Sequence, residues 1–423
     1  MATSVVSGVA GLRERYRQVR QRSVVLCKPL TPEDMMVQSC PEASPAKWHM
    51  AHTAWFFESF VLREFLAGYR LFDRDFPWLF NSYYQTFAEF PDKRLRASFS
   101  RPGLVEVWEF REHVDAAIDR LLEGDVPEEA LRRIELGLHH EEQHQELLMT
   151  DIKHALFTNP LQPAYLAGDV IDAAEVSPLE FIGYHGGLVE IGQSESEGFG
   201  FDNEYPRHRV WLEPFRLASR LVTCAEFAEF MADDGYRRPE LWLSAGWDTA
   251  REQGWQAPLY WRKTEGEWNV GSLRGKRRLQ EVGHCPVAHV SLFEADAYAR
   301  WRGLRLATEA EWETAAARVP IEGNLLESGW LEPTAAETQL DTEHPTQLFG
   351  DCWEWTSSAY LGYPGFAPLA GTLGEYNGKF MSGQMVLRGG SCVTPATHIR
   401  ASYRNFFPPE TRWQFSGIRL ASS

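Results

Sequence analysis

The chain lacks any apolar run long enough to cross a lipid bilayer, and it has only six cysteines in 423 residues. A membrane-spanning helix needs about 20 consecutive apolar residues, so an integral membrane protein is not expected. The cysteines are scattered and show no C-x-x-C spacing, which argues against a zinc ribbon and a disulfide framework. Residues 1–22 contain no apolar stretch of the secretory type, so a cytoplasmic location is expected.

Positive charge is also scarce, because 42 Lys and Arg stand against 59 Asp and Glu, for a formal net charge of −17. Nucleic acids and anionic membrane surfaces are therefore poor candidates as partners, and we expect small-molecule substrates. Large apolar side chains are plentiful, with 44% hydrophobic residues and 16 tryptophans. A chain of this length and composition is expected to bury the cores of two or three domains.

The first 165 residues have the periodicity of a helical domain. The spacing of apolar residues and the positions of Pro and Gly predict helices at about 12–26, 45–68, 104–122 and 127–157. Amphipathic helices of this length favour an antiparallel bundle. The connection over residues 69–102 is long for a compact domain, and such connections are often functional.

Residues 176–423 change in character and predict an α+β domain. Segments 181–184 and 188–192 suggest a hairpin, and 208–212 and 215–219 read as strands. Short helices are expected at 224–234, 292–302 and 309–318, in an otherwise loop-rich region.

Histidines on two of the predicted helices suggest a metal site. His140 and His144 are four residues apart and project from one helical face, so both imidazoles can bind one cation. An earlier helix carries His49 and His52, and spacing does not decide which of them is the third ligand. Three imidazoles suit Fe(II), Zn, Ni or Cu, and they leave coordination positions open for catalysis. The alternative is a set of hydrogen-bonded core histidines.

These segments resemble the hercynine sulfoxide synthases, the nonheme iron enzymes of ergothioneine biosynthesis. The resemblance is carried by residues 48–58 (WHMAHTAWFFE), 80–84 (FNSYY) and 140–146 (HEEQHQE). The second half is similar to formylglycine-generating enzymes and C-type lectins at 305–313 (RLATEAEWE), 349–356 (FGDCWEWT) and 388–391 (RGGS). The resemblance implies a DinB-like bundle with the iron site over 1–165. It also implies a formylglycine-generating-enzyme-like α+β domain over 176–423, with the active site between the two.

The resemblance also assigns roles to individual residues. It implies Fe(2+) ligands at His52, His140 and His144, and it implies a hercynine contact at Gln143. Contacts to the trimethylammonium end, which favours aromatic faces, are implied for Asn405, Phe406 and Phe407. Candidates for delivering a proton or hydrogen atom during oxygen reduction are Tyr83 and Tyr84, with Tyr376 as a third possibility. Carboxylate contacts to the thiol donor are expected at Arg94 and Arg96, unless these belong to a solvated basic loop.

The implied reaction is an Fe(II)- and O2-dependent C–S bond formation at C2 of the hercynine imidazole, with a cysteine-type thiol, giving a sulfoxide. A sister branch, selenoneine synthase, joins hercynine to a selenosugar, and this alternative stays open. A zinc or nickel thiol transferase and a non-catalytic binding protein are further alternatives. Formylglycine-generating enzymes use two cysteines where this chain has only Cys392. Sulfatase activation is therefore not expected, and the second domain is expected to form a substrate wall.

Overall fold

Residues 8–168, 175–336 and 343–423 are described by the structure, a computed structural model of the chain. Two units are distinguished by their internal contacts: Met1–Leu161 with Ala370–Tyr376, and Gln162–Leu369 with Asn377–Ser423. The boundary expected between residues 165 and 176 overlaps residues 169–174, which lie outside the described ranges.

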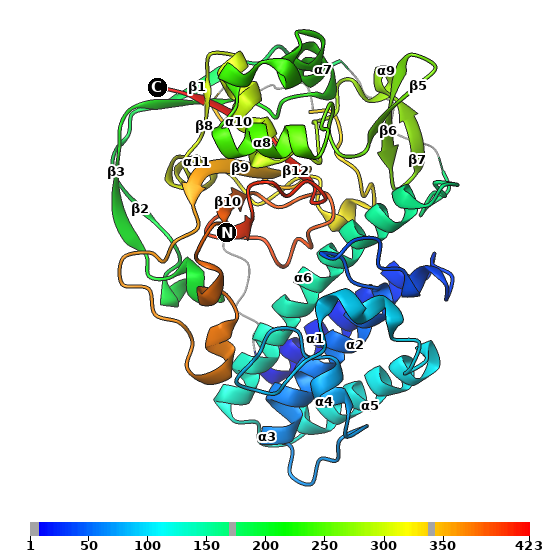
Figure 1. Ribbon diagram of the computed structural model, residues 1–423. Helices are drawn as coiled ribbons and strands as arrows, with labels where there is room; N and C mark the ends of the chain where they lie inside the picture. The colour runs from blue at the N-terminus through cyan, green and yellow to red at the C-terminus, as the bar shows by residue number, and fades with distance from the viewer. Residues whose placement is uncertain (1–7, 169–174, 337–342) are drawn as a thin grey trace. The chain divides into compact units, whose positions relative to one another are not determined.

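The first unit is helical (Figure 1). Its helices are α1 (Gly8–Cys27), α2 (Ala46–Phe57), α3 (Arg63–Phe65), α4 (Phe76–Leu79), α5 (Leu104–Leu122) and α6 (Glu128–Thr158). Helix α2 contacts both α5 and α6, and α1 packs on α6. The predicted helical bundle is therefore confirmed, and α5 and α6 match the predicted ranges closely.

Helix α2 differs from the amphipathic helix that the sequence suggests. All of its residues are buried, because α5, α6 and the short turn at Asp34–Met36 pack around it. A helix enclosed in this way is the centre of its unit, and its polar side chains must find partners inside the protein. The predicted helix also does not run unbroken to residue 68, since a π-helical stretch (Glu58–Leu62) separates α2 from α3.

Gly137 allows α2 and α6 to approach each other closely. A Cβ atom at this position would lie 2.5 Å from Cε1 of Phe57, which is shorter than any normal contact. The glycine therefore brings the following turn of α6, with His140, close to α2. This local feature positions the candidate metal ligands.

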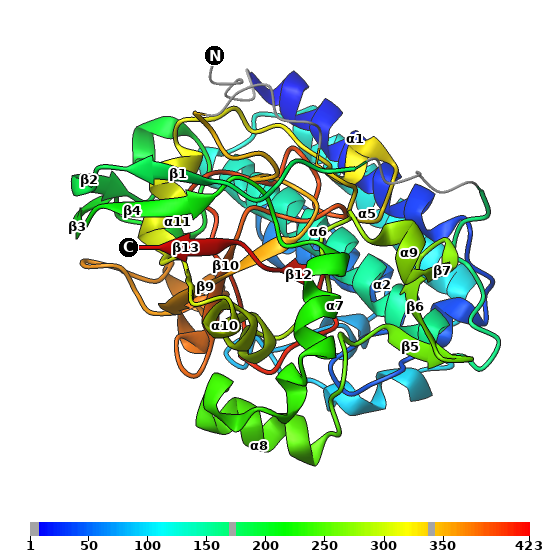
Figure 2. The same cartoon turned by 90° about the horizontal axis from the view of Figure 1, so that it is seen from above.

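The second unit combines short helices with several small sheets (Figure 2). Within the described residues the strand orders are β1-β4-β13-β8, β11-β10-β9-β12, β2-β3 and β5-β6-β7. The strands are β1 (Phe181–Tyr184), β2 (Gly187–Ile191), β3 (His208–Leu212), β4 (Phe215–Ala218), β5 (Trp261–Thr264), β6 (Glu267–Ser272), β7 (Gly275–Arg278), β8 (Arg305–Leu306), β9 (Trp353–Ala359), β10 (Met385–Arg388), β11 (Asn405–Phe407), β12 (Ser416–Gly417) and β13 (Leu420–Ser422). The helices are α7 (Cys224–Ala232), α8 (Ser244–Glu252), α9 (Leu279–Val282), α10 (Leu292–Trp301) and α11 (Glu309–Ala316). The predicted α+β class is confirmed.

The hairpin predicted over residues 181–192 is wrong. Strand β1 pairs with β4, whereas β2 pairs with β3, so the two segments belong to different sheets. The chain turns between them at Gly186 and Gly187, whose φ angles are +68° and +99°. A Cβ atom at Gly186 would lie 2.4 Å from the carbonyl oxygen of Leu212, so only glycine fits this crossing.

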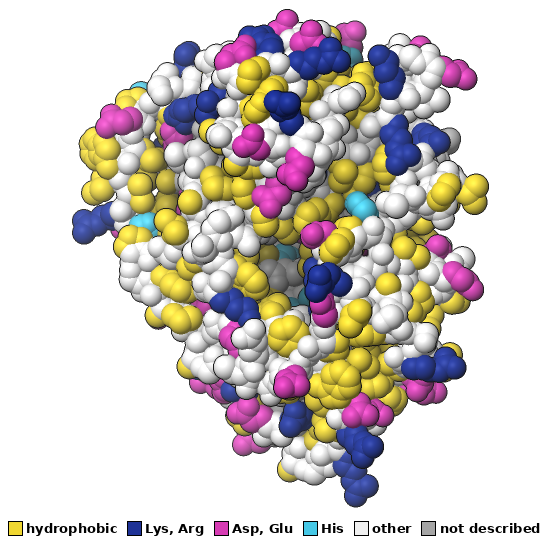
Figure 3. Space-filling model, viewed as in Figure 1, with side chains coloured by type: hydrophobic (Ala, Val, Ile, Leu, Met, Phe, Trp, Pro, Cys, Tyr) yellow, Lys and Arg dark blue, Asp and Glu magenta, His cyan; other side chains and the backbone are white. Residues whose placement is uncertain are grey.

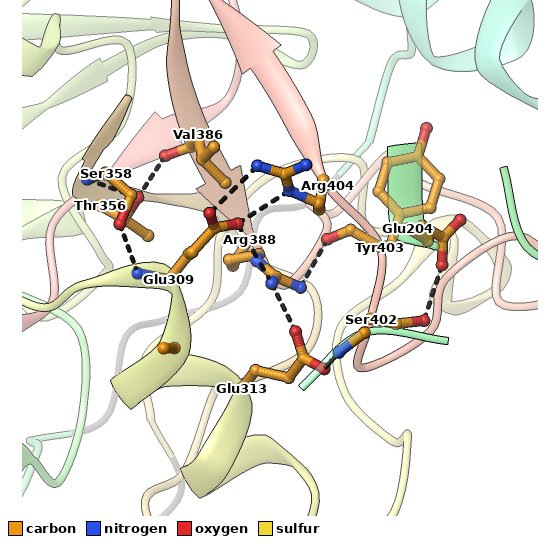
Figure 4. A network of polar contacts seen from close by, with 12 residues as sticks. Glu204, Glu309, Glu313, Thr356, Ser358, Val386, Arg388, Ser402, Tyr403 and Arg404 are labelled. Atoms are coloured by element: carbon orange, nitrogen blue, oxygen red, sulfur yellow. Dashed lines mark hydrogen bonds and ion pairs between the residues drawn. The ribbon is translucent and has the colours of Figure 1, made fainter. Parts of the chain in front are cut away.

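A buried ionic network ties α11 to β10 and to the segment that precedes β11 (Figure 4). Arg388 donates to Glu313 at 2.5 Å and to the carbonyl oxygens of Ala401 and Tyr403 at 2.9 and 3.1 Å. Arg404 donates to both carboxylate oxygens of Glu309, at 2.9 and 3.0 Å. Arg388 is fully buried, so this network is part of the core.

The surface carries charged side chains of both signs between apolar ones, without one large patch of a single sign on the face shown in Figure 3. No helix in the described ranges has the length and apolar character that crossing a membrane requires. The described residues, which include all six cysteines, contain no disulfide.

Candidate metal centre

Three histidine side chains of the helical unit converge on one point. His52 comes from α2, and His140 and His144 come from successive turns of α6. One ring nitrogen of each lies within 4.8 Å of the others. The ring centroids are 5.0 Å apart for His52 and His140, 4.7 Å for His52 and His144, and 4.6 Å for His140 and His144. Three imidazoles at these separations can bind one metal ion.

Burial keeps all three rings neutral. His52 is 0% exposed and His140 is 2% exposed. Desolvation lowers the pKa of His140 to about 3, and it holds the pKa values of His52 and His144 well below their usual range. A histidine must be deprotonated to bind a metal, so these rings are ready ligands at neutral pH.

Ring nitrogens of His52 and His140 lack hydrogen-bond partners among the described residues. Nδ1 of His52 lies 2.6 Å from the carbonyl oxygen of Phe80, which can only accept, so this nitrogen carries the proton. Nε2 of His52 and both ring nitrogens of His140 are buried and make no hydrogen bond. A buried polar atom without a partner costs about 1–3 kcal/mol, and coordination to a metal ion would remove that cost. The three imidazoles therefore fit a metal such as Fe(II), Zn, Ni or Cu.

Aromatic rings hold His52 on both of its faces. Trp48 stacks on it with centroids 4.4 Å apart and planes at 13°, and Trp55 stacks on the other side at 5.1 Å and 14°. The three residues are spaced four and three apart, so they share one face of α2. Phe56 packs on His140 at 4.6 Å. These contacts fix the ring planes before any metal binds.

Tyr83 and Tyr84 lie one ring away from the histidines. Tyr84 is fully buried and stacks on Tyr83 at 4.6 Å, with their hydroxyl oxygens 3.5 Å apart. Its ring centroid is 5.7 Å from that of Trp55, which in turn contacts His52. Burial raises the pKa of Tyr84 well above its usual value, and the neighbouring Tyr83 adds to this effect, so the phenol stays protonated.

Tyr376 and Gln143 meet beside His140. The ring of Tyr376 lies 5.9 Å from the ring of His140, and its hydroxyl donates a hydrogen bond to Oε1 of Gln143. Neighbouring Glu375 fastens this segment to the helical unit, because its carboxylate accepts from the backbone N–H groups of Gln85 and Thr86 at 3.1 and 3.0 Å. A ring contact to His140 thus makes Tyr376 a candidate beside Tyr83 and Tyr84.

The two candidate arginines have different surroundings. The side chain of Arg94 is 73% exposed and pairs with Asp92 at 2.5 Å. Arg96 is only 5% exposed, and its guanidinium lies 3.4 Å from the centroid of the Trp48 ring. It donates to Oγ of Ser44 at 2.8 Å, and burial lowers its pKa to about 9. Arg94 is thus accessible, whereas Arg96 is already part of a stack behind His52.

Asn405, Phe406 and Phe407 form β11 in the second unit. One face of Phe406 is covered by Tyr360, with centroids 3.9 Å apart and planes at 11°, and Phe380 lies at 5.9 Å. Phe407 makes only an edge contact with Trp413, at 6.2 Å among the described rings. Phe407 therefore offers a more open ring than Phe406.

His49 and Asp151, which the sequence did not single out, lie behind His144 in the order His144, His49, Asp151, with His49 named before only as an alternative ligand. Nδ1 of His49 lies 2.8 Å from Nδ1 of His144, and Nε2 of His49 lies 3.0 Å from Oδ2 of Asp151. Asp151 follows His144 by seven residues, so the spacing places both on one face of α6 and could have revealed the pair. His49, the alternative third ligand, thus contacts a ligand candidate instead of joining the group of three.

Two family profiles match the chain. Residues 15–148 match the DinB superfamily, and residues 168–337 and 345–423 match the Sulfatase-modifying factor enzyme 1-like domain. These matches correspond to the helical and the sheet-containing parts of the structure.

Three curated relatives match more than half of the chain. Hercynine oxygenase of Mycolicibacterium smegmatis is 34% identical over 316 residues, covering 68% of this chain and 71% of that protein. Hercynine oxygenase of Mycolicibacterium thermoresistibile is 37% identical, covering 53% of this chain and 54% of that protein. Ergothioneine biosynthesis protein 1 of Schizosaccharomyces pombe is 27% identical, covering 53% of this chain and 28% of that protein. The chain therefore matches about half the length of the second relative and less of the third. Together with the two profiles, the extent of the first match shows that this chain belongs to the hercynine oxygenase family.

Proposed function

We propose that this protein is an Fe(II)- and O2-dependent oxygenase that joins hercynine to a cysteine-type thiol and oxidises the sulfur to a sulfoxide. The bond would form between the sulfur atom and C2 of the hercynine imidazole. The observation that supports this proposal most strongly is the group of three converging histidines, of which His52 and His140 have buried ring nitrogens without a hydrogen-bond partner. The names of the relatives, hercynine oxygenase and ergothioneine biosynthesis protein, give the substrate class and the pathway.

His52, His140 and His144 would hold the iron. When bound, Fe(II) would pass electrons from the two substrates to O2 and provide open positions for the reactants. The protein contributes rings that are already neutral and already oriented by Phe80 and the two tryptophans. Little reorganisation is then needed when the metal binds.

Tyr376 is our first candidate for the proton donor. Its hydroxyl hydrogen is directed at Gln143, and its ring lies against His140. Gln143 would orient this hydroxyl and contact hercynine through its side-chain amide. Tyr83 and Tyr84 stay as candidates, although Trp55 lies between Tyr84 and His52.

Substrate recognition is proposed for residues of both units. Phe407 is the best candidate for the trimethylammonium group because its ring is the more open one, and Asn405 and Phe406 would support it. Arg94 could bind the carboxylate of the donor by exchanging its exposed partner Asp92. Arg96 would have to leave Trp48, so we rank it second. The donor itself, cysteine, γ-glutamylcysteine or a selenosugar, is left to experiment.

A zinc or nickel thiol transferase would use the same three histidines, so the test must separate the two reactions. Protein purified without oxygen is loaded with Fe(II) or Zn(II) and mixed with hercynine and each of the three donors in competition. We expect oxygen uptake only with Fe(II), hercynine and a donor together, and mass spectrometry should then identify a C2-linked sulfoxide or selenium adduct. Product formation with Zn(II) and no oxygen uptake would contradict the proposal. The matched control for His140→Ala is His113→Ala, at a half-buried histidine of α5 away from the three histidines.

The proposed cellular location is the cytoplasm. The six cysteines form no disulfide in the described residues, which is typical of proteins from a reducing compartment.

A further inference from the structure

Behind His144, two buried side chains continue a line of hydrogen bonds away from the proposed metal. The line runs from Nδ1 of His144 to Nδ1 of His49 over 2.8 Å, and from Nε2 of His49 to Oδ2 of Asp151 over 3.0 Å. His49 is 3% exposed and Asp151 is 7% exposed. The three residues come from α2 and α6 of the same unit, and the line ends in a carboxylate.

The direction of these hydrogen bonds follows from the acceptor at the end. Oδ2 of Asp151 also receives the backbone N–H of Ser44 at 2.8 Å, so this oxygen acts as an acceptor. Nε2 of His49 must then carry a proton and donate it to Asp151. A second proton on Nδ1 of His49 would point at Nδ1 of His144 and move the proton of that ring to Nε2, the nitrogen that the proposed metal needs.

The state of His144 follows in turn. With Nε2 of His144 bound to the metal, Nδ1 of His49 has only a lone pair, because the proton of His49 lies on Nε2. Two lone pairs 2.8 Å apart would repel each other, so Nδ1 of His144 must be the donor. His144 is therefore left with its lone pair on Nε2.

We propose that His49 and Asp151 are positioning residues that fix the proton of His144 on Nδ1 and so keep Nε2 available to the metal. This inference rests on the proposed metal site, whereas the tautomer of His144 in the metal-free protein can be measured independently of it. His52 has the same arrangement, with its proton on Nδ1 directed at the carbonyl of Phe80. His140 has no such partner and is held by packing on Phe56.

We call the hydrogen-bonded line of His144, His49 and Asp151 the relay. It matters because a neutral imidazole in water prefers its proton on Nε2, the nitrogen that the metal needs. A hydrogen-bond partner behind a metal-binding histidine selects the tautomer and strengthens the ligand, and loss of such partners typically lowers metal affinity about 10–100-fold. Here a second histidine transmits the effect of a carboxylate, so the negative charge stays one ring away from the metal.

The direct test reads the tautomer in the full-length, metal-free protein. Histidine is labelled with ¹⁵N, and long-range ¹H–¹⁵N correlation spectra near neutral pH are assigned with His144→Gln and His52→Gln. We expect Nδ1–H tautomers for both His144 and His52 in the wild type. In His49→Phe, His144 should lose this preference while His52 keeps it.

A second measurement follows the consequence for metal binding. The affinity for Co(II) alone, a spectroscopic substitute for Fe(II), is measured by competition with a chelator. His49→Phe should weaken binding about 10–100-fold, whereas the control His113→Phe should leave it unchanged. Asp151→Asn retains a carbonyl oxygen that can accept from both Ser44 and His49, so it should weaken binding less than Asp151→Leu.

The outcomes separate the relay from the metal centre. An Nε2–H tautomer for His144 in the wild type would overturn the relay even if Co(II) binds to the three histidines. Equal Co(II) affinity in the wild type, His49→Phe and Asp151→Leu would overturn its role in positioning. Failure of the wild type to bind Co(II) would instead count against the metal centre, and the spectra would still decide the tautomer. If His49→Phe does not fold, the wild-type spectrum decides the tautomer of His144, and the Co(II) affinities of the two Asp151 variants decide the positioning role.

Discussion

The second unit buries Glu309 and Glu313 against Arg388 and Arg404, whereas the helical unit buries His140 with neither ring nitrogen hydrogen-bonded. In the first case each carboxylate oxygen accepts at least one hydrogen bond (Figure 4). In the second case the histidine lies in the core as a neutral group whose N–H and whose lone pair make no hydrogen bond. Both clusters are buried, so burial alone does not distinguish a structural site from a functional one.

Helix α6 contains the same contrast between adjacent residues. Glu141 is bound by Ser23, Arg20 and Arg111 at 2.6, 2.8 and 2.9 Å. Although burial opposes it, Arg20 and Arg111 lower the pKa of Glu141 to about 2. His140, the preceding residue, has no hydrogen-bond partner at all. A buried polar group that makes its hydrogen bonds stabilises the fold. A buried polar group without hydrogen-bond partners is a candidate metal ligand.

The largest effect is expected from breaking the buried ion pair of Glu309 and Arg404, in which both carboxylate oxygens are hydrogen-bonded. Glu309→Ala leaves Arg404 buried without its bidentate partner, and loss of one member of a buried ion pair typically costs about 3–5 kcal/mol. The free energy of unfolding in urea should fall by that amount. The exposed pair of Glu128 and Arg132 supplies the control, since Glu128→Ala should cost less than about 1 kcal/mol. Similar losses of unfolding free energy in the two variants would contradict the distinction between buried and exposed ion pairs.

Tyr376→Phe should give the next largest effect, this time on turnover. Removal of a general acid typically slows a reaction about 10²–10⁴-fold, and we expect the lower part of that range with diversion of the thiol toward sulfinic acid. Tyr83→Phe and Tyr84→Phe should change the product ratio less, because Trp55 separates Tyr84 from His52. Product ratios are measured by mass spectrometry. A stronger diversion in Tyr84→Phe than in Tyr376→Phe would move the proton donor to the tandem tyrosines.

Replacing His140, whose ring nitrogens make no hydrogen bond, should stabilise the metal-free protein. His140→Leu keeps a similar volume and removes two buried nitrogens without partners, so the free energy of unfolding should stay equal or rise by about 1–3 kcal/mol. Glu141→Ala, at the adjacent position, should instead lower it by about 3–5 kcal/mol. Equal destabilisation by both substitutions would mean that His140 is an ordinary structural residue.

The smallest effect is a dependence of stability on pH. The folded pKa of His140 is about 3, and those of His52 and His144 are also lowered, whereas an unfolded histidine titrates near about 6.5. Below about pH 6.5 the unfolded state binds protons that the folded state does not, so stability is complete above this pH and falls on acidification toward about pH 3. Each histidine contributes up to about 1.4 kcal/mol per pH unit. The advantage of metal-free His140→Leu over the metal-free wild type should grow between about pH 6.5 and about pH 5, and parallel curves would contradict the lowered pKa.

The helical unit was largely predictable because its apolar periodicity is strong and its ends carry Pro and Gly. Segment Ala370–Tyr376 was not placed with the helices, since its contacts to Gln85 and Thr86 join residues far apart in the sequence. The false hairpin at 181–192 had suitable strand residues, but only the close approach at Gly186 reveals that the chain changes sheet. The three-stranded sheet β5–β7 was missed because most of its residues are exposed or half-buried and show little apolar alternation.

The histidines of the site were identifiable from their spacing, but their surroundings were not. The helical repeat places Trp48, His52 and Trp55 on one face, yet it does not predict that the two indoles enclose the imidazole. The carbonyl of Phe80 comes from an irregular connection, so no periodic signal points to it. Arg96 was expected to meet substrate because it is charged, whereas the structure places it over Trp48 in the core. Its role in binding stays a prediction.

The central claim is that three imidazoles, and no other side chains, hold one ferrous ion. Its most direct test is the iron content of anaerobically reconstituted wild type and of His52→Ala, His140→Ala and His144→Ala, with His113→Ala as the control. We expect about one iron per chain in the wild type and the control and less than about a tenth of that in each of the three variants. Full iron content with undiminished turnover in all three variants would contradict the account.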